Sequence, residues 1–162
     1  MKRLKVLAIA AATGRIGYVF LIGGKLCDWG LSRKASKRPA LAAAQTKLWI
    51  EQLKPDVVVI EKISSISTKG SRSKYLIEAI ATVAAQANLL DVCVTRLTAF
   101  KNKYEEAKSL GERFPEINAW VPRPRRIWEP EPRNTILFEA LALACVVISD
   151  QSRGDLRRMR NA

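Results

Sequence analysis

Three apolar segments, each the length of a β-strand, open the sequence, and tight turns join them. They cover residues 4–10, 16–22 and 25–31. The first is a continuous apolar run broken only by Lys5, which is typical of a buried strand. Gly23-Gly24 separates the second and third segments and is a hairpin signal. The chain is therefore predicted to begin as a three-stranded antiparallel meander.

Helices and short strands alternate after the meander. Residues 57–60 are β-branched and apolar on both faces, which predicts a central, parallel strand. The other predicted elements are helices over 39–53, 73–90, 101–110 and 134–148, and a strand over 92–95. This order predicts an α/β domain with a five-stranded mixed sheet, three strands antiparallel and then two parallel, flanked by helices on both faces.

The 162 residues fit one domain, which we expect to cover residues 1–150. Residues 114–133 are rich in proline, so they are predicted to form an irregular excursion rather than a helix or a central strand. Residues 151–162 are predicted to be a basic C-terminal tail that adds affinity for phosphate.

The charge of the chain points to its partner. There are 28 Lys and Arg residues against 15 Asp and Glu residues, a formal net charge of +13. Phosphate backbones and anionic lipids are the usual targets of such a charge. No apolar run approaches the roughly 18 residues that a membrane span requires. Nucleic acid is therefore the expected partner, and no membrane partner is expected.

The cysteine and histidine content limits the expected cellular location and the possible types of catalytic site. Cys27, Cys93 and Cys145 are odd in number and lie in apolar strings, so buried thiols in a reducing, cytoplasmic location are expected. The N-terminal residues mimic a signal peptide, but a first strand followed by a hairpin explains them better. The chain has no histidine, which excludes Ser-His-Asp and Cys-His nucleophiles and the commonest zinc ligand.

Two carboxylates stand where a site is expected. Glu61 ends the buried strand, and ligand sites in α/β sheets gather at the carboxyl ends of strands. Glu139 is the one acid inside the apolar helix over 134–148. The alternative interpretations are that Glu61 pairs with Lys62 at the start of a loop, and that Glu139 lies on a solvent-facing stripe. The site interpretation is favoured because a lone carboxylate in apolar surroundings is costly.

Convergent acids without histidine, in a basic chain, predict a phosphodiester hydrolase that uses Mg²⁺ or Mn²⁺. Such a site places two ions about 4 Å apart and normally needs three or four carboxylates. The missing ligands are expected from the first strand and the last helix. Glu129 or Glu131 of the proline-rich segment is a further possible source.

The ordered motifs resemble the RuvC family of Holliday junction resolvases, within the ribonuclease-H-like superfamily. Residues 7–18 (LAIAAATGRIGY) are similar to its first motif, residues 58–61 (VVIE) to its second acidic motif, and residues 139–144 (EALALA) to its last motif. The resemblance spans about residues 4–148. It implies a metal-dependent endonuclease that acts on branched DNA as a homodimer, with Glu61 and Glu139 as metal ligands.

The chain departs from the family pattern at the first motif. The family's first-strand aspartate, which bridges both metals, falls on Ala10, so Ala10 occupies a catalytic position. The second acid of the last motif falls on Ile136. Ala10 is either a natural loss that yields a non-catalytic binding protein or a deliberate Asp→Ala change that traps a substrate complex. The retention of Glu61 and Glu139 favours the second origin.

Basic residues flank the expected site and are predicted to contact nucleic acid: Lys62, Lys69, Arg72, Lys74, Lys101, Lys103, Arg123, Arg125 and Arg126. Trp120 and Trp128, near the last three, either stack on bases or pack on the domain. The broad apolar face of the helix over 73–90 suggests a dimer interface. An RNA-processing nuclease of related fold stays open, whereas an actin-like phosphotransferase would need a longer chain.

Overall fold

The first three strands form the predicted meander. The computed structural model describes residues 3–63, 70–94 and 102–160. β1 (Lys5–Ala12), β2 (Arg15–Ile22) and β3 (Lys25–Ser32) pair antiparallel in chain order. Gly23 and Gly24 both take positive φ, 59° and 81°, which lets the two-residue turn follow the twist of the strands.

The remaining strands extend the sheet on the other side of β1. β4 (Val57–Glu61) pairs parallel with β1, and β5 (Leu90–Val94) pairs parallel with β4. The strand order is β3-β2-β1-β4-β5. The predicted five-stranded mixed sheet is therefore confirmed. β4 is buried on both faces because Val58 and Ile60 lie in one core and Val57 and Val59 in the other.

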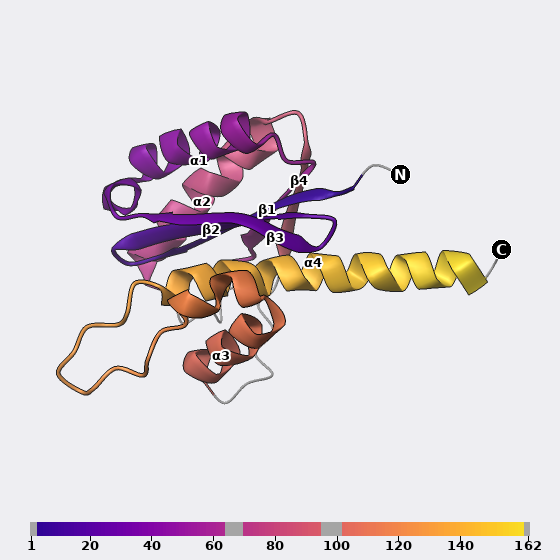
Figure 1. Cartoon of the computed structure of the whole chain (residues 1–162). Coiled ribbons are helices and arrows are strands. Elements are labelled where there is room, and N and C mark those ends of the chain that lie inside the picture. The colour runs from indigo at the N-terminus through magenta and orange to yellow at the C-terminus, as the bar shows by residue number, and fades with distance from the viewer. Residues whose placement is uncertain (1–2, 64–69, 95–101, 161–162) are drawn as a thin grey trace.

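Helices cover both faces of the sheet (Figure 1). One layer holds the 3₁₀-helix η1 (Lys34–Lys37), α1 (Pro39–Leu53) and α2 (Ser71–Gln86). The other layer holds α3 (Lys103–Arg113), the 3₁₀-helix η2 (Pro115–Trp120) and α4 (Thr135–Arg160). Each layer packs its own apolar core against the sheet.

Two predictions about helices differ from the structure. The last helix was expected to end at residue 148, but α4 continues to Arg160, so most of the predicted tail is helical. The broad apolar face of α2 was interpreted as a dimer interface. Its residues Leu76, Ile77, Ile80 and Ala84 are instead buried in the core that α2 shares with α1 and the sheet.

The prediction of buried cysteines is wrong. Cys27 and Cys93 are exposed and Cys145 is half-buried. Cys27 and Cys93 lie on β3 and β5, the two edge strands of the sheet, where the covering layers leave outward side chains open. Among the residues that the structure describes, no helix has the length and apolar character needed to cross a membrane.

Candidate active site and nucleic-acid interface

β1 and β4 bring Ala10 and Glu61 to the same edge of the sheet. Ile9 pairs with Ile60 in the parallel register, so Ala10 and Glu61 are the next residues along the two strands. Side chains alternate between the faces of a strand. Ile9 and Ile60 face α1 and α2, whereas Ala10 belongs to the core under α4. Ala10 and Glu61 are therefore neighbours on the α4 face, at the carboxyl ends of parallel strands, where α/β sheets place ligands.

The two positions differ in their surroundings. Ala10 is 2% exposed and is enclosed by apolar neighbours. Glu61 is half-buried, and its Oε2 atom is enclosed by protein. The backbone N–H of Lys62 donates to the carbonyl of Val94 at 2.7 Å, which continues the β4–β5 pairing past Glu61. Glu61 is thus held at the end of a well-paired strand.

α4 carries Glu139 over this face of the sheet. The helix packs against β1, β2 and β4. Its first turn lies on β2, because a Cβ built on Gly17 would stand 2.7 Å from Cγ2 of Ile136. Gly17 is the residue of β2 that pairs with Ala10. Glu139 follows one helical turn after Ile136 and is half-buried.

The site lacks a complete set of metal ligands. Among the residues that the structure describes, no three acidic or cysteine side chains form a group that could hold a metal ion. The position beside Glu61 is the methyl group of Ala10, and the place of the second acid in α4 is the fully buried side chain of Ile136. The residues present do not fit the metal pair that the sequence motifs imply.

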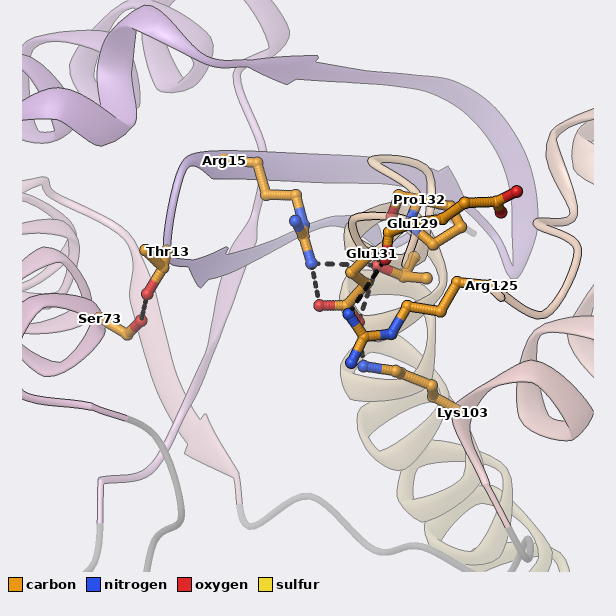
Figure 2. A network of polar contacts seen from close by, with 9 residues as sticks. Thr13, Arg15, Ser73, Lys103, Arg125, Glu129, Glu131 and Pro132 are labelled. Carbon is orange, nitrogen blue, oxygen red and sulfur yellow. Dashed lines mark hydrogen bonds and ion pairs between the residues drawn. The ribbon is translucent and has the colours of Figure 1, made fainter. Parts of the chain in front are cut away.

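Glu131 forms an ion-pair network with two basic residues (Figure 2), and it does not complete a group of three metal ligands among the described residues. Its carboxylate pairs with Arg15 of β2 and with Lys103 of α3. Oγ1 of Thr135, the first residue of α4, lies 3.4 Å from Arg15 Nη2 and 3.4 Å from Glu131 Oε1. The network ties the end of the proline-rich segment to β2, α3 and the start of α4.

The two cations control the ionisation of Glu131. Burial raises its pKa, but the hydrogen bond from Lys103 and the charges of Arg15 and Lys103 outweigh burial and hold the pKa below its ordinary value. Glu131 is therefore an anion at neutral pH, and Lys103 is already paired. A nucleic-acid phosphate that contacts Lys103 has to share it with Glu131.

The proline-rich segment ends in an exposed, basic loop over residues 121–133, which projects from the body of the protein (Figure 1). Arg123, Arg125 and Arg126 are exposed along it. At its tip Ile127 is 99% and Trp128 76% exposed, and the guanidinium of Arg126 lies 5.7 Å from the centre of the Trp128 ring.

The two tryptophans of this segment separate into different roles. Trp120 packs edge-on against Trp29 of β3, with ring centres 5.2 Å apart, so it contacts the domain. Trp128 is left free to contact a partner. Glu129 pairs with Arg126 at 4.0 Å and closes a turn at the loop tip. It is therefore occupied within the loop.

The other predicted nucleic-acid contacts lie near the β4–α2 connection. Lys62 and Arg72 are exposed, and Lys74 is half-buried. Lys69 and Lys101 lie outside the described residues. Sequence reasoning missed the ion pair of Arg15 with Glu131, and it assigned no role to the basic residues within 32–38. The run of charge there was the available signal.

Comparison with solved structures relates this arrangement to known proteins. RuvC of Thermus thermophilus superposes with a TM-score of 0.59 at 15% identity, over 87% of this chain and 91% of that chain. The Holliday junction resolvase of Fowlpox virus, in complex with its junction DNA, superposes with a TM-score of 0.60 at 13% identity, over 91% of this chain and 99% of that chain. The chain has the RuvC-like resolvase fold.

A third resolvase-fold structure, the yeast mitochondrial Holliday junction resolvase Ydc2, superposes with a TM-score of 0.55 at 11% identity, over 87% of this chain and 77% of that chain. No protein-family model and no curated protein sequence matches the chain. The likeness to the resolvases is thus one of fold, and the residues at the site have to carry the argument for function.

Proposed function

We propose that this chain is a structure-selective endonuclease of the RuvC-like type that binds branched DNA and whose cleavage is impaired by Ala10. The observation that carries the proposal is the placement of Ala10 beside Glu61, on one face and at the carboxyl ends of two parallel strands. A carboxylate at position 10 would stand where α/β sheets hold their ligands. The resolvase fold of the chain supports the choice of substrate.

The impairment follows from the ligand set. Two Mg²⁺ or Mn²⁺ ions would need several oxygen ligands. Negatively charged carboxylates would also offset the repulsion between the two cations. Glu61 and Glu139 alone do not supply enough, and the described residues hold no group of three. An Ala10→Asp change would add a third carboxylate on the face that carries Glu61. We therefore assign no catalytic step to the chain as it stands.

The binding half of the proposal rests on charge. The net charge of +13 and the exposed side chains of Lys62, Arg72, Arg123, Arg125 and Arg126 suit contacts to phosphates that do not depend on sequence. Lys74 is half-buried and Lys103 is paired with Glu131, so both would contribute less. We expect the affinity for nucleic acid to fall steeply as the salt concentration rises.

A binding panel tests this half. The chain is titrated with a four-way junction, a flap, a linear duplex, a single strand and an RNA–DNA hybrid of matched sequence, at two salt concentrations. The proposal expects the junction to bind most tightly at both. Equal affinity for all forms would contradict structure selectivity, and preference for the hybrid would favour an RNA-processing nuclease of the same fold.

Metal binding tests the proposed catalytic site without a cleavage assay. We expect Mg²⁺ or Mn²⁺ to raise the unfolding midpoint of the Ala10→Asp variant and to leave Ala10→Asn unchanged, because only the carboxylate completes the ligand set. The two side chains have nearly the same size, so strain in the buried position is common to both. Equal responses of the two variants would contradict the assignment of position 10.

A non-catalytic nucleic-acid-binding protein of the same fold is the second candidate. The apolar surroundings of Ala10 and the full burial of Ile136 favour it. It predicts the same order of affinities in the binding panel but no effect of metal on the unfolding midpoint of Ala10→Asp.

Light scattering tests whether the chain forms the homodimer that paired cuts at a junction would need. A monomer in the presence of junction DNA would contradict it.

A further inference from the structure

We propose that a positively charged groove next to the candidate active-site edge, the η1 groove, binds the phosphate backbone of the nucleic acid. The η1 groove has a volume of about 770 Å³ and lies between the β1–β2 turn, η1 and the start of α2. Its cationic lining residues are Arg33, Lys34, Lys37, Arg38 and Arg72. The inference rests on the proposed function for its partner, and it adds a contact region to it.

The charges of the η1 groove are not neutralised by the protein. All five cationic side chains are exposed. Among the described residues none of them takes part in an ion pair, and no acid lines the groove. Arg15 and Lys103, by contrast, both pair with Glu131. Five like charges around one concavity repel each other, and a bound polyanion relieves that repulsion.

The main chain that carries these cations is held in place. The Ser36 hydroxyl donates to the carbonyl of Arg33 at 2.6 Å, and the N–H of Ala35 donates to Ser32 Oγ at 3.1 Å. Ala35 and Ser36 are buried. Arg72 of α2 donates to the carbonyl of Lys37 at 3.3 Å. The groove is thus braced from within η1 and from α2, so binding an anion orders mainly side-chain ends.

The location connects the groove to the active-site edge. Thr13 and Gly14 line it and follow directly on β1, the strand that carries Ala10. Thr13 Oγ1 lies 3.3 Å from Ser73 Oγ, which joins the turn to α2. Figure 2 shows this pair and the Glu131 network at separate positions around the β1–β2 turn. A nucleic-acid strand that crosses the sheet edge near Ala10 would reach the η1 groove on the α1–α2 side of the sheet.

The lining suits a phosphate backbone better than stacked bases. It contains no aromatic side chain on which a base could stack and no carboxylate that could accept from a base. A small anion such as a single phosphate would use only one or two of the five cations. Cations spread from η1 to α2 suit successive phosphates of one strand, a contact that positions nucleic acid without reading its sequence.

The test compares two charge-matched double variants. Lys34→Gln/Lys37→Gln removes two charges from the groove. Lys25→Gln/Lys47→Gln removes two exposed charges elsewhere, since Lys25 lies at the opposite end of the hairpin and Lys47 outside the groove on α1. Affinity for a four-way junction and for a matched duplex is measured over a range of salt concentrations, after unfolding midpoints have shown that both variants fold.

A plot of log binding constant against log salt concentration has a negative slope. We expect the groove variant to reduce the magnitude of this slope by about 1 to 2, because each lost phosphate contact contributes about 0.9. The control variant should keep the slope of the unmodified chain. Lys34→Arg/Lys37→Arg should restore the slope, since it restores the charge. If the groove and control variants share one slope, the inference fails while the proposed function stands.

Two further outcomes separate the remaining possibilities. If the unmodified chain binds neither junction nor duplex, the proposed function fails and this inference fails with it. If the groove variant loses affinity for inorganic pyrophosphate but keeps its slope for the junction, the groove is a site for small anions, and the assignment to a nucleic-acid backbone is wrong.

Discussion

At the scale of single residues, Gly17 and Ile136 set how closely α4 sits beside position 10. A Cβ at Gly17 would stand 2.7 Å from Cγ2 of Ile136, closer than real carbon contacts allow. We expect Gly17→Ala to lower the free energy of unfolding by about 1 to 3 kcal/mol, through overpacking. Urea unfolding measures the loss. The cost should largely vanish in an Ile136→Ala background, and an undiminished cost there would show that another contact is responsible.

The Glu131 network makes a prediction about pH. The pKa of Glu131 is lower in the folded chain than its ordinary value of 4.5, so its contribution is fully present above that value and is lost as the pH falls through the folded pKa. Glu131→Gln should lower the free energy of unfolding by about 1 to 2 kcal/mol at neutral pH, and by little in strong acid.

Urea unfolding at both pH values measures this difference, with Glu129→Gln as the control because its pair with Arg126 is long and exposed. An equal loss from Glu131→Gln at both pH values would contradict the ionic origin. The sequence could not predict this network. Arg15 and Glu131 are 116 positions apart, and only the folded sheet and the start of α4 bring them together.

At the scale of elements, the exposed tip of the loop over residues 121–133 is expected to serve binding rather than folding. Trp128 is 76% exposed at its tip and makes no contribution to the cores. Trp128→Ala should therefore leave the unfolding midpoint unchanged and weaken binding to single-stranded or branched nucleic acid by about 1 to 3 kcal/mol, the range for one stacked base. Fluorescence anisotropy measures the affinity.

Leu90→Ala is the control, because Leu90 is 61% exposed on the edge strand β5 and lies outside the surfaces assigned to nucleic acid. If both variants bind as tightly as the unmodified chain, the loop tip does not stack on bases. Proline content correctly predicted the irregular backbone of residues 121–133, but it did not predict the 3₁₀-helix η2 at the start of the same segment. Sequence alone left Trp120 and Trp128 equivalent, and the contact of Trp120 with Trp29 on β3 distinguishes them.

At the scale of the whole molecule, the topology was predictable because local patterns determine it. Tight turns require antiparallel neighbours, and helices between strands produce parallel ones. Features that depend on distant contacts were not predictable: the burial of the apolar α2 face against α1, the exposure of Cys27 and Cys93 on edge strands, and the bracing of η1 by Arg72. The continuation of α4 to Arg160 was also missed, because the polar and charged residues after Ile148 lack the apolar spacing that predicts a helix.

The most direct test of the central claim is cleavage of a four-way junction by the Ala10→Asp variant in Mg²⁺ or Mn²⁺. The unmodified chain, Ala10→Asn and the double variant Ala10→Asp/Glu61→Gln are measured beside it at saturating protein. The account predicts that Ala10→Asp alone cuts the junction, while the other three bind it without cutting. Failure of Ala10→Asp to cut any branched, flapped or RNA–DNA substrate, despite folding and binding, would contradict the account.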